Sequence, residues 1–256
     1  MEHGADMNDV KQVAARLDGE LRALPVRNTP SERAVCRRVF RELAPASPEF
    51  ILALAGKLLR AFDYRWIAYE LIESHRGAFQ RLGQAELEEF GLGINSWWTV
   101  DSFARTLSGP AWLNGQVPDA LIHQWAGSED RWWRRAALVS TVALNVRSHG
   151  GLGDVPRTLA VCRLLVDDHD DMVAKAMSWA LRHLVVHDPD AVRRFLGEHE
   201  AALAARVKRE VRAKLATGLK NPGRKRRSNE GRGVPLPASG KVLRAASRVG
   251  VKVGPR

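Results

Sequence analysis

Trp97 and Asp101 are the residues of this sequence whose types and spacing are best suited to chemistry. They stand four positions apart, so in a helix they share one face. Burying an unpaired carboxylate in such a face would cost several kcal/mol, and we therefore expect the face to be open. In a chain with a formal net charge of +11, an open Trp/Asp face predicts a site for a cationic or polyanionic ligand.

Length and composition describe a globular protein of one or two domains. The chain has 256 residues and is 45% apolar, which suffices for a sizeable core. No apolar run approaches the roughly 18 residues that cross a bilayer, and the acidic first twenty residues argue against a signal peptide. The two cysteines, Cys36 and Cys162, have no metal-ligand spacing and are too few for a disulfide scaffold. We therefore expect no membrane partner and a reducing, cytoplasmic location.

The positive charge is concentrated at the C-terminal end. Residues 218–256 contain eleven Lys and Arg residues and one Glu, a net charge of +10, which leaves about +1 for residues 1–217. Because this segment is rich in Gly and Pro and lacks apolar periodicity, we predict a disordered basic tail over 218–256. Such a tail is typical of an electrostatic anchor for a polyanion such as nucleic acid. A solvated tail without a specific role is the alternative.

The remainder of the chain predicts helices throughout. Apolar residues recur every three or four positions, for example over 50–62 and 159–165, and no period-2 alternation interrupts them. Four similar helix starts are separated by 32, 35 and 40 residues, and each begins with a good N-cap residue: Asp63, Asn95, Asp130 and Asp170. This spacing predicts an all-α, HEAT-like α-α superhelical solenoid over residues 1–217. An irregular helical bundle is the alternative.

The register of the solenoid brings further residues to Trp97 and Asp101. Counted from the predicted helix starts, Asp101 stands at position +6, and Arg135 and Lys175 both stand at +5. Trp179 follows Lys175 by one turn. Because equivalent faces of stacked helices line one side of a superhelix, we expect these five side chains to converge on one concave groove.

Three motifs in this order resemble the HEAT-like DNA alkylation repair glycosylases, the AlkD-like family. They are SWWTVDS at 96–102, WWRRAAL at 132–138 and KAMSWALR at 175–182, and the resemblance spans roughly residues 25–215. It implies that Asp101 is the catalytic carboxylate, with Trp97 and Trp179 as groove tryptophans. A loop one residue shorter than in the family archetype leaves Trp98 as an alternative partner, although the four-residue spacing favours Trp97.

The resemblance also implies residues that contact DNA. Arg135 and Lys175 are expected to hold phosphates beside the lesion. Further DNA-binding residues are predicted on the same helix and on the closing helix of the family: Arg182, Lys208 and Arg209. The other tryptophans are assigned to the core or to packing between helices: Trp66, Trp98, Trp125 and Trp133.

The activity implied by the resemblance is that of a monofunctional alkylpurine DNA glycosylase. Such an enzyme hydrolyses the N-glycosidic bond of cationic N3- or N7-alkylated purines in duplex DNA without flipping the base. A cationic purine is a good leaving group, so one carboxylate that stabilises the oxocarbenium-like sugar and places a water is sufficient. The expected partner is double-stranded DNA with alkylated purines, bound by a monomer in the cytoplasm at the nucleoid. No cofactor and no metal are expected.

Other interpretations remain open from the residues alone. Trp97 has a second interpretation as a core residue, and Asp101 has one as a salt-bridge partner of Arg135. His183 and His187 have the i, i+4 spacing of metal ligands, but no third ligand is evident. At the level of the whole chain, a HEAT-like binder of distorted or branched DNA without catalysis is an alternative. A protein-binding solenoid whose basic tail recruits an acidic partner is another.

Overall fold

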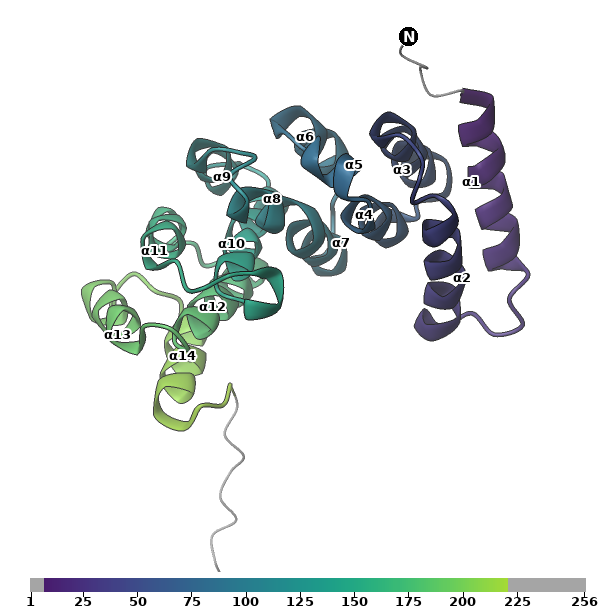
Figure 1. Cartoon of the computed structure of the whole chain (residues 1–256). Helices are drawn as coiled ribbons and strands as arrows, with labels where there is room; N and C mark the ends of the chain where they lie inside the picture. Colours follow the sequence, from purple (N-terminus) through teal and green to yellow (C-terminus); the bar gives the residue numbers. More distant parts are fainter. Residues whose placement is uncertain (1–6, 221–256) are drawn as a thin grey trace, which may run out of the picture. The chain divides into compact units, whose positions relative to one another are not determined.

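The computed structural model describes residues 7–220, and within this range the chain is all-α and forms a helical solenoid. The helices form two rows (Figure 1). One row contains α2 (Thr29–Glu42), α4 (Arg65–Ser74), α7 (Trp97–Phe103), α10 (Arg131–Leu144), α12 (Asp171–Leu184) and α14 (Ala205–Thr217). The other contains α1 (Met7–Arg22), α3 (Pro48–Phe62), α6 (Gln84–Gly91), α9 (Asp119–Ala126), α11 (Val155–Leu164) and α13 (Pro189–Glu198). Two short helices, α5 (Arg76–Gln80) and α8 (Gly109–Leu113), lie in the connections.

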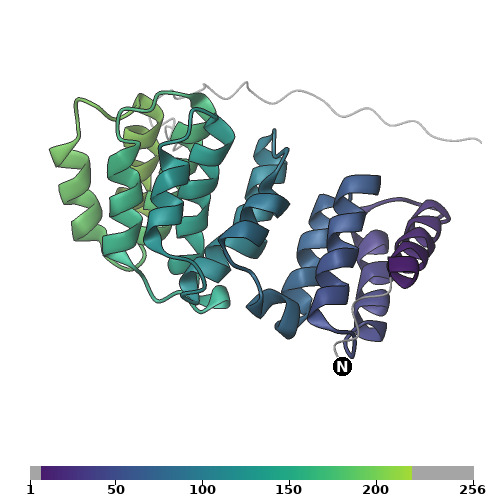
Figure 2. The same ribbon diagram turned by 90° about the horizontal axis from the view of Figure 1, so that it is seen from above.

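The first of these rows lies on the concave side of the solenoid in Figure 1, and Figure 2 shows the same helices from above. Its members pack in series, α4 against α7, α7 against α10, α10 against α12, and α12 against α14. From α4 onward they begin at residues 65, 97, 131, 171 and 205, which are 32, 34, 40 and 34 residues apart. The predicted solenoid is therefore confirmed, with a spacing close to that read from the sequence.

Two of the four predicted helix caps are confirmed, and two are wrong. Asp130 accepts a hydrogen bond from the backbone of α10, and Asp170 does the same for α12. The cap of α7 is Ser96, one residue after the predicted Asn95, because Ser96 and Thr99 form a reciprocal capping box. Asp63 caps no helix start; it ends α3 in the left-handed conformation, with φ 54°, because only two residues connect α3 to α4.

The chain from α7 into α8 is a continuous helical segment with a wide turn in its middle. Residues Ala104–Ser108 form a π-helix, η1, in which the Gly109 N–H donates to the Ala104 carbonyl. Pro110, at the start of α8, has no N–H to continue regular pairing. A π turn of this kind changes which side chains of a helix face the same direction, and such turns occur frequently at functional sites.

Helix α10 is the most enclosed element, and every residue from Arg135 to Leu144 is buried. It packs against α7, α8, α9, α11 and α12, so it has no open face along this length. One of its buried residues is an arginine, which requires a partner for its charge. None of the helices in the described range is long and apolar enough to span a membrane. The predicted tail lies outside the described residues from residue 221 onward, so its disorder and the domain boundary at residue 217 stay predictions.

Candidate functional site

Asp101 and Arg135 form a bidentate ion pair between α7 and α10. The Arg135 Nε and Nη2 atoms donate to the two Asp101 carboxylate oxygens, each at 2.9 Å. The third guanidinium nitrogen, Nη1, donates to the Met172 carbonyl at 2.5 Å. The Arg135 side chain is 6% exposed and the Asp101 side chain 18% exposed. The expected open face is present at Trp97, which is exposed, whereas Asp101 is partly buried. The alternative that Asp101 pairs with Arg135 is confirmed, and the buried guanidinium compensates the burial of the carboxylate.

The two tryptophans that precede Asp101 are both exposed. Trp97 is 58% exposed and Trp98 is 45% exposed, although both begin a helix of the concave row. The assignment of Trp98 to the core was therefore wrong. Trp125 and Trp133 do pack in the core region, with ring centroids 4.9 Å apart and Phe103 beside them. Trp66 packs partly against the core and partly faces the groove, with Arg33 over its ring.

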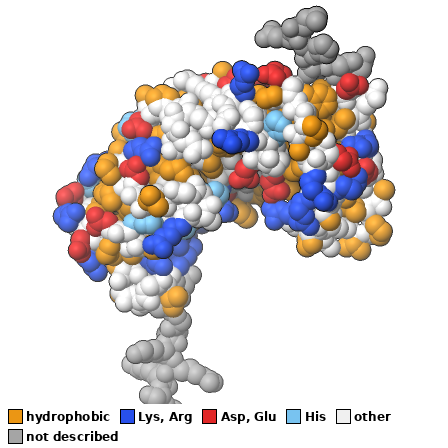
Figure 3. All heavy atoms as spheres, in the orientation of Figure 1, with side chains coloured by type: hydrophobic (Ala, Val, Ile, Leu, Met, Phe, Trp, Pro, Cys, Tyr) orange, Lys and Arg blue, Asp and Glu red, His pale blue; other side chains and the backbone are white. Residues whose placement is uncertain are grey.

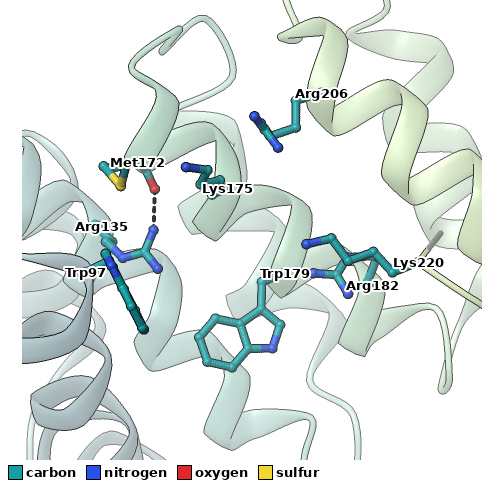
Figure 4. A pocket seen from close by; sticks show the side chains of 8 residues that line it. All are labelled: Trp97, Arg135, Met172, Lys175, Trp179, Arg182, Arg206 and Lys220. Carbon is teal, nitrogen blue, oxygen red and sulfur yellow. Dashed lines mark hydrogen bonds between the residues drawn. The ribbon is translucent and has the colours of Figure 1, made fainter.

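Two adjoining pockets lie along the concave row. The first, which we call the basic pocket, is drawn in Figure 4 and is lined by Trp97, Arg135, Met172, Lys175, Trp179, Arg182, Arg206 and Lys220. The indole rings of Trp97 and Trp179 border the same open space, and cationic side chains of α12 and α14 surround it. Figure 3 shows Lys and Arg side chains on both sides of the hollowed face. This charge distribution suits a polyanionic ligand.

The second pocket, the mixed-charge pocket, shares Trp97 with the first and contains the Asp101 carboxylate. Its lining comes from α2, α4, α7, η1 and the 3-10 helix η2 (Arg147–His149). It is lined by Thr29, Glu32, Arg33, Trp66, Glu70, Glu73, Trp97, Trp98, Asp101, Ser102, Arg105, Thr106 and His149. Trp97 and Asp101 thus stand at the junction of a basic pocket and a pocket with charges of both signs.

Burial shapes the ionisation of the carboxyl groups in this region. Burial raises the pKa of Asp101 above its ordinary value, although Arg135 and, more weakly, Arg105 oppose this shift. Burial also raises the pKa of Glu73, with a further contribution from the neighbouring Glu70. Glu70 itself pairs with Arg33 at 2.6 Å. Asp101 is therefore a partly buried carboxyl group whose ionised form is stabilised by the guanidinium of Arg135.

The structure brings together most of the residues that the sequence predicted for the site. Trp97, Arg135, Lys175, Trp179 and Arg182 line the basic pocket, and Asp101 is bonded to one of them. Lys175 also pairs with Asp171 on its own helix at 2.6 Å, which leaves its ammonium at the pocket rim. Their convergence follows from the series packing of α7, α10 and α12.

Lys208 and Arg209 lie elsewhere on α14 and line neither of these two pockets. Lys208 donates to the Glu200 carbonyl at 2.9 Å, before the start of the helix. The groove is reached instead by Arg206, which shares a helix face with the buried Glu210. Glu210 accepts a hydrogen bond from Ser178 at 2.7 Å and so ties α14 to α12.

His183 and His187 have partners other than a metal ion. The His183 ring lies 6.1 Å from the Trp179 ring, and burial lowers the pKa of His183 to about 4. The His187 Nε2 lies 2.9 Å from the Asn145 carbonyl oxygen. Among residues 7–220, no group of three or more His, Cys, Asp or Glu side chains is arranged to hold a metal ion. His183 therefore packs beside Trp179, and His187 contacts the backbone of Asn145.

Several groove residues were missed by sequence reasoning. Arg105 follows Asp101 by four residues, the same spacing that linked Trp97 to Asp101, and this signal was available. Arg206 and Glu73 have no distinguishing motif, because a single Arg or Glu on a helix is usually a solvated residue. Lys220 was counted only as part of the predicted tail, yet it reaches the basic pocket and lies 3.6 Å from Glu210.

The sequence was compared with known protein families and with curated proteins. Residues 1–215 match the model of a family that is described as DNA alkylation repair enzyme. The matched range covers the residues of both pockets except Lys220. No curated protein matches the sequence.

Proposed function

Because this chain belongs to the DNA alkylation repair enzyme family, we propose that it is a monofunctional DNA glycosylase for cationic alkylpurines. In this proposal it hydrolyses the N-glycosidic bond of N3- and N7-alkylated purines in duplex DNA, without flipping the base out of the helix. Asp101 is the catalytic carboxylate, and Trp97 and Trp179 contact the lesion nucleotide.

The observation that carries the proposal is the placement of Asp101. Its two oxygens are fixed by one buried guanidinium, next to the exposed Trp97 and at the junction of two groove pockets. A carboxylate has about four lone-pair sites, so the bidentate contact with Arg135 leaves about two for a sugar and a water. We therefore regard Arg135 as a positioning residue for Asp101.

The chemistry requires no acid for the departing base. When the bond between C1′ and the purine nitrogen breaks, the electron pair of that bond goes to the cationic base, which leaves neutral. The deoxyribose takes up the positive charge, which the Asp101 carboxylate and the π face of Trp97 stabilise. A water that is hydrogen-bonded to Asp101 then attacks C1′, and its proton passes to solvent through the carboxylate. The product is an abasic site.

The open groove supports a mechanism in which the base stays stacked. Trp97 projects from a concave surface and is 58% exposed, so it is suited to contact a sugar and a base edge from the side of a duplex. An enzyme that flips bases instead encloses the extruded base in a close-fitting cavity. Lys175, Arg182 and Arg206 line the basic pocket, and their positive charges support binding of the backbone phosphates of a duplex there.

The test is excision of N7-methylguanine from a duplex by wild type and by Asp101→Asn. Heating in alkali cleaves the strand at each abasic site and so measures the product. We expect Asp101→Asn to lower the single-turnover rate by about 10²- to 10³-fold, the cost of removing one strong electrostatic stabiliser. Binding of undamaged duplex should change much less.

Asp168→Asn is the matched control. Asp168 also pairs with an arginine of α10, Arg134 at 2.7 Å, and is partly buried, but it lines neither of the two pockets. Equal rates for wild type and Asp101→Asn would remove Asp101 from the mechanism. If neither protein excised the base and both bound DNA junctions tightly, the non-catalytic binder of branched DNA would be the better interpretation.

A further inference from the structure

Arg105 is an exposed cation in the groove that the proposed mechanism does not use. It lies in η1, four residues after Asp101, and lines the mixed-charge pocket. Within residues 7–220 its guanidinium has no hydrogen bond and no ion-pair partner within 4.0 Å. It does contact an aromatic ring, because the Arg105 Cζ lies 5.8 Å from the centroid of Trp179.

This contact links the two pockets. Trp179 belongs to α12 and lines the basic pocket, whereas Arg105 belongs to η1 and lines the mixed-charge pocket. Burial is the main cause of the lowered pKa of His183 and of the raised pKa of Asp101, and the charge of Arg105 makes a smaller contribution at both groups. The guanidinium thus stands beside the path that a ligand would take along the groove past Asp101.

The geometry of this contact favours an anion as the ligand of the Arg105 guanidinium. A guanidinium over an indole ring keeps the N–H donors at its edge free for a planar, bidentate contact with a phosphate. Lys175 pairs with Asp171 and Arg206 pairs with Glu210. Arg182 donates to the Ser178 hydroxyl at 3.2 Å. An exposed guanidinium without such a partner requires little desolvation or rearrangement to accept an oxyanion.

We propose that Arg105 binds a backbone phosphate of the DNA strand that lies in the groove, while its cation–π contact holds the Trp179 ring in place. Lys175, Arg182 and Arg206 would then hold the strand from α12 and α14, and Arg105 would hold it from η1. The inference rests on the proposed function only for the position of the lesion. The phosphate contact itself requires DNA binding and no excision.

The test is a binding experiment with a duplex that cannot be cleaved, in which a tetrahydrofuran abasic-site analogue replaces the lesion nucleotide. Dissociation constants are measured over a range of salt for wild type, Arg105→Gln and Arg105→Lys. We expect Arg105→Gln to weaken binding about 5- to 50-fold, and to reduce the slope of log K against log salt by about 1. Arg105→Lys keeps the charge and should retain most of the slope.

Neutral methylphosphonates then identify the phosphate. Each phosphate within three nucleotides of the abasic analogue is replaced in turn, and wild type and Arg105→Gln are compared on each duplex. At the position that Arg105 contacts, the difference between the two proteins should disappear. If the difference persists on every duplex, or the salt slope of Arg105→Gln equals that of wild type, the proposal is wrong.

Arg131→Gln is the matched control. Arg131 also stacks on a tryptophan, with its Cζ 4.8 Å from the Trp132 centroid, but it pairs with Asp170 and lines neither of the two pockets. It should leave both affinity and slope near the wild-type values; an effect equal to that of Arg105→Gln would show a nonspecific loss of charge and overturn the proposal. Failure of the excision proposal would appear only in the Asp101→Asn assay, so the two results are independent.

Discussion

Asp101 combines two features that are usually in conflict, partial burial and the negative charge that the proposed mechanism requires. Burial favours the protonated acid, whereas the bidentate contact with Arg135 favours the carboxylate. The balance leaves the pKa of Asp101 above its ordinary value of 3.8. A catalytic carboxylate in this state should lose its charge at a higher pH than a surface aspartate.

This balance predicts the pH dependence of excision. The rate should fall as pH decreases through the raised pKa of Asp101, because only the carboxylate stabilises the sugar cation. Single-turnover rates on N7-methylguanine duplex, measured from pH 8 downward with circular dichroism to verify folding, provide the check. The residual rate of Asp101→Asn should lack this acid limb. A wild-type rate that shows no decrease between pH 8 and pH 3.8, in protein that remains folded, would contradict the assignment.

Single substitutions can also decide whether Trp97 or Trp98 is the groove tryptophan. The two are neighbours on α7 and both are exposed, but only Trp97 lines both pockets. Trp97→Ala should lower the excision rate about 2- to 30-fold, the contribution of one π face to a nearby cation. Trp98→Ala should have a smaller effect and acts as the control. The reverse order would assign the groove tryptophan to Trp98.

At the level of elements, the segment from α7 through η1 to α8 determines the site. It carries Trp97, Asp101 and Arg105 on one face and is fixed to α10 at its far end. There the Ser108 and Ser140 hydroxyls lie 2.7 Å apart. Gly109 follows, and a Cβ on it would lie 2.8 Å from the Ser140 carbonyl oxygen. The close approach of α8 to α10 therefore requires glycine at this position.

Gly109→Ala should accordingly destabilise the protein. The added methyl would overlap backbone atoms of α10 and η1, at a cost of about 1–3 kcal/mol in the free energy of unfolding. Urea denaturation measures the change. Gly197→Ala is the control, because Gly197 lies in helix α13 and a Cβ there would meet no atom within 4 Å beyond its chain neighbours and the backbone of its own helix. There alanine should stabilise by about 0.5–1 kcal/mol. Equal effects at both sites would mean that α8 and α10 separate without cost.

At the level of the whole molecule, charge is divided between the groove and the C-terminal end of the chain. The basic pocket contributes five cationic residues from α10, α12, α14 and the residues after α14. Residues 221–256 contribute ten Lys and Arg residues and one Glu. Cations that bind DNA phosphates release counterions, so both groups of cations are expected to make DNA affinity decrease with salt concentration.

A protein that ends at Lys220 separates these contributions. It should excise N7-methylguanine at the wild-type single-turnover rate under saturating conditions, because both pockets are intact. Its DNA affinity should be weaker and less dependent on salt than that of the full chain, with a slope that remains clearly negative. Fluorescence anisotropy over a salt titration measures this. A full-length variant with neutral residues in place of those ten cations is the control. A truncated protein with no salt-dependent affinity would favour the protein-binding solenoid.

The helical class, the repeat spacing and the shared face of Trp97 and Asp101 could be predicted from the sequence, because each depends on local periodicity. An i, i+4 spacing in a helix places two side chains on one face whatever surrounds them. Capping at Asp130 and Asp170 is equally local. The cap at Asp63 failed because a two-residue connection between helices imposed a left-handed conformation that its residue type does not reveal.

The repeat register predicted which residues converge on the groove, but only the tertiary structure decided which side chains contact each other across helices. Asp101 and Arg135 are 34 positions apart, and Arg105 and Trp179 are 74 apart. Their contacts depend on the packing of α7, η1, α10 and α12. The same packing exposed Trp98 and turned Lys208 away from the pockets, although their residue types suggested otherwise. Periodicity fixes the face of one helix, whereas the packing of neighbouring helices determines what that face contacts.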